Sequence, residues 1–177
     1  MLFFKENRSK IMPNHIYNII EFRTKDKCYA SSIRDSIRNE SSDMDFNKLL
    51  SNSLKSNSFE GESSVIHGNV DWNLQNWGTK WNAWDSQCCL EDRGEYVHGR
   101  ITFFTANTTP YPIFIALSKM YHKIRFKVRF ADQHAFGCDC GFLVFQNGQE
   151  IDRHISPNEF GSDEQFNYWE DIALNIN

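Results

Sequence analysis

Residues 71–85, DWNLQNWGTKWNAWD, decide the fold and hold four of the five tryptophans of the chain. Asp71 suits the N-cap of a short helix over 72–77, because its carboxylate accepts hydrogen bonds from free amides of the first turn. Gly78 is expected to end that helix, since glycine adopts the left-handed conformation without a Cβ clash. Residues 79–81 then begin an extended run, because β-branched and aromatic side chains suit a pleated surface.

The indoles of this stretch favour an interior position. Each buried indole removes a large apolar area from water, so several of them in one segment can seed a core. The alternative is a solvent-facing aromatic platform on which bases or sugars stack. On the first interpretation the segment is a structural anchor, and the function lies on charged outer surfaces. The anchor residues are Trp72, Trp77, Gly78, Lys80, Trp81 and Trp84.

Composition limits the class of protein. A chain of 177 residues, 40% apolar and 15% aromatic, fits one domain with a substantial core. Its net charge of −4 excludes a protein that is basic all over but allows a local basic patch. Five cysteines, an odd number, do not resemble a disulfide framework. Since no apolar run is long enough to span a bilayer, we expect a cytoplasmic protein without a membrane partner.

Periodic segments predict the order of helices and strands. Residues 14–23 predict a central strand, and an apolar stripe from Tyr29 to Ile37 predicts a helix. Residues 46–50 fit a short strand or a packed loop. Further along, the patterns predict a strand over 100–105, a helix over 112–121, a strand over 123–130, a hairpin around Asn147-Gly148 and a C-terminal helix capped by Ser162 and Gln165.

The expected organisation is one α+β domain over 12–177. Residues 1–11 are expected to be a flexible N-terminal extension. Two long loops are expected, at 51–69 and 86–99, of which the second is a hairpin or an excursion. Helices interleaved with hairpin-joined strands predict a mostly antiparallel sheet with helices packed on one face.

Several strings carry a resemblance to a known family. They are Met12-Pro13-Asn14-His15, Phe46-Asn47, Asn76-Trp77-Gly78-Thr79-Lys80-Trp81-Asn82-Ala83, Phe103-x-Thr105, Pro110-x-Pro112, Ala116-Leu117-Ser118 and Tyr121. With these strings the chain resembles phage- and plasmid-borne proteins that have a YubB-type ferredoxin-like domain. The resemblance implies a ferredoxin-like core of mobile-element origin and no established activity. Where that family often has a tryptophan after Phe-x-Thr, this chain has Asn107.

Residues 123–130, KIRFKVRF, alternate without a fault between apolar and cationic side chains. A cationic stripe can follow a phosphate backbone or meet an acidic protein surface. Alternatively, its charges protect a sheet edge from pairing, or meet the acidic residues near the C-terminus. Those acidic residues are Glu159, Asp163, Glu164, Glu170 and Asp171. The candidate binding residues are Lys119, Lys123, Arg125, Lys127 and Arg129.

A possible metal site consists of His134, Cys138 and Cys140, with His154 or His122 as a fourth ligand. The Cys-x-Cys spacing departs from the two to four intervening residues that structural zinc sites use. The alternative is a pair of small buried thiols. A metal-assisted hydrolase is therefore the third functional hypothesis, and we expect no cofactor.

A cysteine nucleophile is the remaining catalytic candidate, with Cys88-Cys89 activated by His98. No glycine-rich oxyanion turn or phosphate-binding loop accompanies it. We therefore expect a binding protein without catalytic residues.

Two binding hypotheses follow from the sequence. The first is an accessory protein that docks a host or element-encoded protein, such as a defence or replication factor, through the basic strand and the two loops. The second is nucleic-acid binding by the strand at 123–130.

Overall fold

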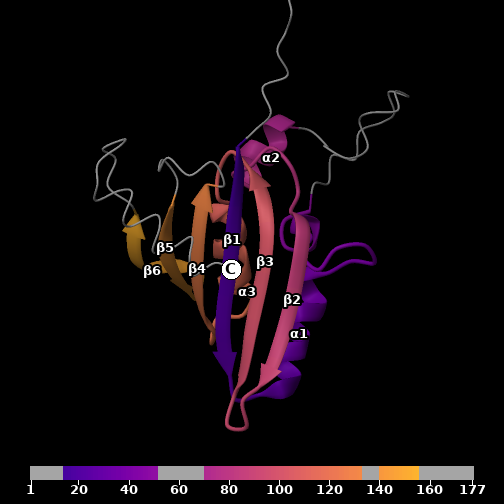
Figure 1. Cartoon of the computed structure of the whole chain (residues 1–177), viewed down its shortest axis with the longest axis vertical. Coiled ribbons are helices and arrows are strands. Elements are labelled where there is room, and N and C mark those ends of the chain that lie inside the picture. Colours follow the sequence, from indigo (N-terminus) through magenta and orange to yellow (C-terminus); the bar gives the residue numbers. More distant parts are fainter. Residues whose placement is uncertain (1–13, 52–69, 133–139, 156–177) are drawn as a thin grey trace, which may run out of the picture.

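A strand near the N-terminus, β1 (His15–Thr24), runs through the middle of a six-stranded sheet. The computed structural model describes residues 14–51, 70–132 and 140–155 (Figure 1). The remaining elements, in chain order, are α1 (Lys27–Ile37), the 3₁₀ turn η1 (Phe46–Lys48), α2 (Val70–Asn76), β2 (Trp84–Asp92), β3 (Val97–Ala106), α3 (Tyr111–Met120), β4 (Arg125–Asp132), β5 (Cys140–Gln146) and β6 (Gln149–Ile155).

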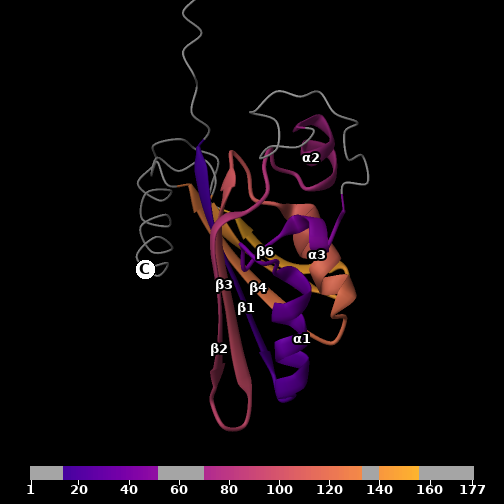
Figure 2. The ribbon, with the colours of Figure 1, turned by 90° about the vertical axis from the view of Figure 1, so that its right-hand side faces the viewer.

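The strands lie in the order β2-β3-β1-β4-β5-β6, and every neighbouring pair is antiparallel. The first four strands, with α1 after β1 and α3 after β3, form the ferredoxin-like arrangement. The β5–β6 hairpin extends the sheet beyond β4. Figure 2 shows α1 and α3 on one face of the sheet. The α+β class and the mostly antiparallel sheet are therefore confirmed, and so is the packing of α1 and α3 on one face, as far as the described residues extend.

The main core lies between the sheet and these helices. Alternate residues of β1 enter it, namely Ile16, Ile20 and Phe22, because side chains of a strand point to opposite faces in turn. Helix α1 contributes the apolar stripe that the sequence predicts. In α3 the predicted stripe is only partly found, because Met120 is 47% exposed and Phe114 is buried instead. From α1, α3 and β4 the buried residues are Ala30, Ile33, Ile37, Ile113, Phe114, Leu117, Phe126, Val128 and Phe130.

The anchor segment joins α2 to the sheet. Trp77 is 4% exposed, its ring meets Phe46 edge-on at 5.7 Å, and its Nε1 donates to the carbonyl oxygen of Leu50 at 2.9 Å. Thr79 Oγ1 donates to the carbonyl oxygen of Ala106 at 2.9 Å, at the end of β3. Gly78 lies between these two attachments with φ of +76°, as expected of a residue that ends a helix.

A buried carboxylate completes this attachment. Asp45 accepts hydrogen bonds from Asn82 Nδ2 at 2.7 Å and from Asn39 Nδ2 at 2.8 Å. Burial by itself would raise the pKa of Asp45, but the hydrogen bonds from Asn82, Asn39 and Asn47 outweigh burial and lower that pKa below its ordinary value. The anchor residue Asn82 also accepts from the backbone amide of Phe46 at 2.9 Å, so the anchor and η1 are bound to each other directly.

Some expectations for the anchor are wrong. Asp71 lies within the first turn of α2, so it does not precede the helix as a cap. The extended run begins at Trp84 and not at residue 79. Trp72 packs against the main core beside Trp77, whereas Trp81 and Trp84 lie outside that core. The segment therefore contributes only two of its four indoles to the main core.

Other boundaries also differ from the sequence pattern. Residues 86–99 are not a loop, because β2 and β3 take up most of them as a hairpin. The sequence of β2 lacks a clear apolar alternation, because β2 is an edge strand with many exposed polar residues. Residues 46–48 form a 3₁₀ turn, which confirms the packed loop rather than a strand. The Asn147-Gly148 hairpin is confirmed, with φ of +52° and +73°.

Three predictions lie outside the described residues. They are the flexible extension at 1–11, the loop at 51–69, of which only Ser51 is described, and the C-terminal helix.

Replacing Gly78 by alanine tests the anchor. We expect Gly78→Ala to lower the free energy of unfolding by about 2 kcal/mol or more. About 1–2 kcal/mol comes from forcing a Cβ into the left-handed region. The rest comes from overpacking, because a Cβ at this position would lie 2.9 Å from Pro112 Cδ. Urea denaturation of the purified variant measures the loss.

Gly94→Ala is the matched control for this experiment. Gly94 has a similar φ of +81°, but a Cβ there would have no heavy atom within 4 Å. It should therefore lose only the conformational part, about 1 kcal/mol. Equal losses in the two variants would contradict a packed anchor.

Candidate functional site

The sheet face opposite α1 and α3 carries aromatic, cationic and acidic side chains and a groove. We call it the back face. No helix of the described residues lies on it (Figure 2). Tyr17 pairs with Phe104 of β3 and with Ala131 of β4, and directly paired residues project to the same side of a sheet. Continuing this register assigns to the back face the odd-numbered residues of β1 and β4 and the even-numbered residues of β3 from His98 to Phe104.

An aromatic cluster occupies one end of the back face. Tyr17 and Phe104 lie on the two adjacent central strands, with ring centroids 4.9 Å apart. Trp84 of edge strand β2 stacks on Phe104 at 6.2 Å with an interplanar angle of 21°. His15 and Trp81 meet the Trp84 ring edge-on at 5.2 Å and 6.0 Å. All five rings are partly exposed, which distinguishes them from the buried Trp77.

A groove of about 460 Å³ continues from this cluster across β1, β3 and β2. Glu21 of β1 is one of its lining residues, 3.7 Å from His98 Nε2 and 3.5 Å from Arg129 Nη2. These side chains are about one quarter exposed or less, so water screens them less than it screens surface pairs. The lining residues include Tyr17, Glu21, Cys89, His98, Arg100 and Thr102.

Cations outnumber carboxylates on the back face. By register, the cations are Arg23, Arg100, Arg125, Lys127 and Arg129, and the carboxylates are Glu21, Glu91 and Asp152. A chain with a net charge of −4 therefore presents a locally basic surface here.

Only three of the five predicted cationic residues lie together on β4. Arg125 and Lys127 are exposed and Arg129 is half-buried, all on β4. Lys123 lies in the turn before that strand. Lys119 lies at the end of α3, in the helix layer, so it does not continue the stripe. Because β4 pairs with β1 on one side and β5 on the other, the prediction that these charges protect a sheet edge is wrong.

The back face also contains a small buried cluster. Ile19, Ala131 and Cys140 are 0%, 4% and 0% exposed, with Tyr17 packed against them. Cys140 pairs with Ala131 across the β4–β5 ladder. This cluster is separated from the main core by the sheet itself.

The candidate metal ligands divide between described and undescribed residues. His134 and Cys138 lie outside the described residues, and Cys140 is buried in the cluster with Ile19. Of the alternative fourth ligands, both His122 and His154 are exposed. The described part of the chain contains no group of three His, Cys, Asp or Glu side chains that could hold a metal ion.

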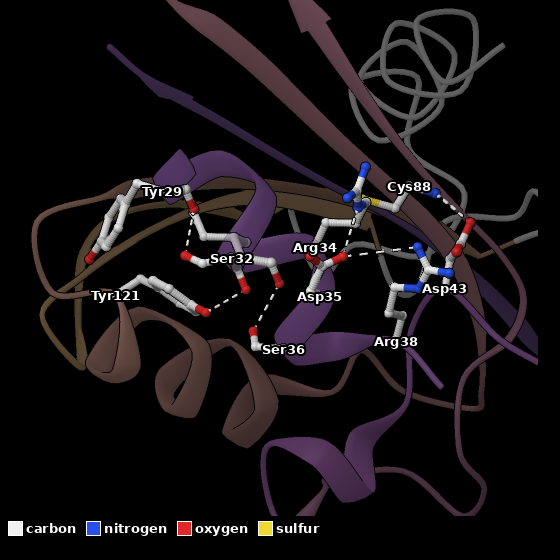
Figure 3. A network of polar contacts seen from close by, with 10 residues as sticks. Tyr29, Ser32, Arg34, Asp35, Ser36, Arg38, Asp43, Cys88 and Tyr121 are labelled. Carbon is white, nitrogen blue, oxygen red and sulfur yellow. Dashed lines mark hydrogen bonds and ion pairs between the residues drawn. The ribbon is translucent and has the colours of Figure 1, made fainter. Parts of the chain in front are cut away.

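The proposed nucleophile is wrong for Cys88, because Cys88 and His98 project to opposite sides of the sheet. Cys89, the other proposed cysteine, lies on the back face and lines the same groove as His98. Cys88 packs towards the main core, and its backbone amide donates to Asp43 Oδ2 at 3.1 Å (Figure 3). Burial, helped by the negative charge of Asp43, raises the pKa of the Cys88 thiol to about 12. His98 lies on the back face beside Glu21. Neither the geometry nor the protonation state of this thiol suits a nucleophile.

Sequence reasoning missed Tyr17, Glu21 and Phe104 as site residues. The signal was present in the alternation of residues 14–23 and 100–105, whose back-face positions include Tyr17, Glu21, Arg100 and Phe104. That these positions lie side by side follows only from the pairing of β1 with β3.

Differential alkylation of the cysteines tests this geometry. At pH 8, iodoacetamide should modify the exposed Cys89 and Cys28 well before Cys88 in the folded protein. With a pKa of about 12, on the order of one Cys88 thiol in ten thousand is ionised at that pH. Peptide mass spectrometry over a time course measures the rates, and urea-unfolded protein is the control in which the rates should converge. Equal rates for Cys88 and Cys89 in folded protein would contradict the assignment.

No helix among the described residues is both long and apolar enough to span a bilayer. No curated protein matches the sequence. Among solved structures, a protein named api92 from Yersinia pseudotuberculosis is similar, at 16% identity and a TM-score of 0.46. The match covers 64% of this chain and 39% of that chain, so this chain spans well under half of that protein's length.

The model of a protein family described as the ferredoxin-like domain in Api92-like protein matches residues 76–173. The matched region begins in the anchor segment and contains β2 to β6 with α3. It is more than half of the chain. This chain therefore belongs to the family of Api92-like ferredoxin-like domains.

Proposed function

We propose that this protein binds single-stranded nucleic acid on the back face of its sheet. The aromatic cluster would stack bases, and the neighbouring cations would contact phosphates. The observation that carries this proposal is the placement of Tyr17 and Phe104 on the two adjacent central strands, on the face that lacks α1 and α3.

Stacking is the first contribution. Every base has a π-face, so exposed aromatic side chains on a sheet bind successive bases with little sequence preference. Four-stranded sheets of RNA-binding modules use aromatic residues on their central strands in this way. Here Phe104 lies between Tyr17 and Trp84, so the three rings form a row across β1, β3 and β2.

Charge is the second contribution. Arg125 and Lys127 are exposed, and their long side chains can follow a phosphate backbone. Arg100 projects from β3 on the same face as Phe104, four residues away along the strand. Arg129 already contacts the Glu21 carboxylate at 3.5 Å. The exposed cations Arg125 and Lys127 would therefore make the main contacts with phosphates.

An oligonucleotide-binding measurement tests the proposal. Fluorescence anisotropy with single-stranded DNA and RNA should detect binding that weakens steeply with added salt. Phe104→Ala should lower the affinity about 5- to 150-fold, since one stacked base contributes about 1–3 kcal/mol. The double variant Arg125→Glu and Lys127→Glu should weaken binding to a similar extent and make it less sensitive to salt.

The matched control reverses two exposed lysines that are not on the back face, Lys48 and Lys119. It changes the net charge by the same amount as the double variant, so it separates a local site from a general loss of attraction. Absence of binding at low salt, or equal weakening by the control, would reject the proposal.

Docking of a protein is the second candidate function. Val70 and Leu74, four residues apart in α2, are 37% and 43% exposed and form an apolar pair on one side of that helix. Such a pair suits the apolar centre of a small protein interface. The resemblance to phage- and plasmid-borne proteins supports a host or element-encoded partner in the cytoplasm, such as a defence or replication factor.

A pull-down from host lysate tests this second candidate. Leu74→Asp should abolish recovery of a partner protein, because it places a charge at the centre of the apolar pair. Met120→Asp is the matched control, since Met120 is 47% exposed at the end of another helix. Equal recovery with both variants would reject docking through α2.

A further inference from the structure

The buried cluster on the back face needs a cover that the described residues do not supply. Ile19, Ala131 and Cys140 project away from α1 and α3 and are nevertheless 0–4% exposed. Neighbouring side chains of a sheet shield such residues from the side, but only a further layer shields them from above. Among the described helices and strands, none lies over this face. The described helices and strands therefore leave the cover of this cluster unassigned.

We propose that residues 156–177 of the same chain bind the back face and occupy the site when nucleic acid is absent. The competitive part of this inference rests on the function proposed above, whereas the intramolecular binding does not. The segment would act as a built-in competitor that sets how readily the protein takes up a single strand.

The path of the chain places this segment at the right position. Residue 156 follows Ile155, the last residue of β6, which pairs with Gly141 of β5. Gly141 is the neighbour in sequence of Cys140, a member of the buried cluster. The segment therefore leaves the sheet beside the cluster that needs covering.

Charge distinguishes this segment from the other candidates. Residues 156–177 contain Glu159, Asp163, Glu164, Glu170 and Asp171 and no lysine or arginine. The cluster is bordered by back-face cations, because Arg129 pairs with Ile19 and Lys127 with Glu21. Opposite charges attract across such an interface and fix its orientation.

The other undescribed segments fit less well. Residues 52–69 join η1 to α2, two elements that the anchor holds on the helix side of the sheet. Residues 1–13 carry Lys5, Arg8 and Lys10 against a single carboxylate, Glu6, so the basic face would repel them. Residues 133–139 also follow β4 beside the cluster, but they contain one carboxylate, Asp139, against the five of residues 156–177.

Residues 156–177 resemble the proposed ligand, since both combine flat rings with negative charges. Besides its five carboxylates, the segment contains four aromatic residues, namely Phe160, Phe166, Tyr168 and Trp169. Rings of this kind can pack against the aromatic cluster and the carboxylates can meet the cations. Because the segment is tethered, its effective concentration at the face is high, and it competes well even if its contacts are individually weak.

Site-specific photo-cross-linking of the full chain tests where the segment lies. The photoreactive amino acid benzoylphenylalanine replaces Tyr17, which packs against the buried cluster and is itself aromatic. Peptide mass spectrometry should find cross-links to peptides from 156–177 within the same chain. The matched control carries the same group at Met120, exposed at the end of α3 in the helix layer, and should give none. Cross-links to 1–13, to 133–139 or to a second molecule would overturn the proposal.

A charge-neutralised full chain tests the competition. The variant with Asp163→Asn, Glu164→Gln, Glu170→Gln and Asp171→Asn should bind a single-stranded oligonucleotide about 3- to 10-fold more tightly, because a larger fraction of its sites is vacant. The control neutralises four exposed carboxylates elsewhere, Asp35, Glu40, Asp92 and Glu95, and should gain clearly less. Equal gains would overturn the competition.

The two experiments separate the two proposals. Cross-links to 156–177 without any oligonucleotide binding would reject the nucleic-acid function and support the intramolecular docking. Oligonucleotide binding together with cross-links that persist unchanged at saturation would support the function and overturn the competition.

Discussion

The structure depends on the position of β1 between β3 and β4, which requires this strand to be buried on both of its faces. Ile16, Ile20 and Phe22 enter the main core, and Ile19 enters the small cluster on the back face. A shift of one residue in register would exchange these two sets, placing Tyr17 and Glu21 under the helices. Two-sided burial therefore selects one register for β1, and that register brings Tyr17 beside Phe104 and Glu21 beside Arg129.

The anchor segment contacts both faces of the sheet at one end. Trp77 attaches α2 and η1 to the helix side, and Thr79 attaches the same segment to the end of β3. Trp81 and Trp84 then continue on the other side of the sheet, where they join the aromatic cluster. One stretch of sequence thus supplies both core packing and part of the candidate binding surface, so substitutions there affect stability and binding through different residues.

Charge is distributed unevenly over this protein. The net charge of the chain is negative, yet cations gather on this face and carboxylates gather near the C-terminus. Such separation of charge within one chain provides attraction between its parts and towards an external polyanion. Salt screens both attractions, so each would weaken as the ionic strength rises.

Local signals in the sequence determined a large part of the fold. The alternation at 123–130, the apolar stripe of α1, the left-handed Gly78 and the Asn147-Gly148 turn each depend on residues close in sequence, and each is found in the structure. The candidate site depended on partners far apart in sequence. That β4 is an internal strand, that Cys88 and His98 lie on opposite faces, and that Tyr17 meets Phe104 follow from strand order and register. A single strand's pattern shows which residues share a face, but only long-range pairing decides which face that is and what lies beside it.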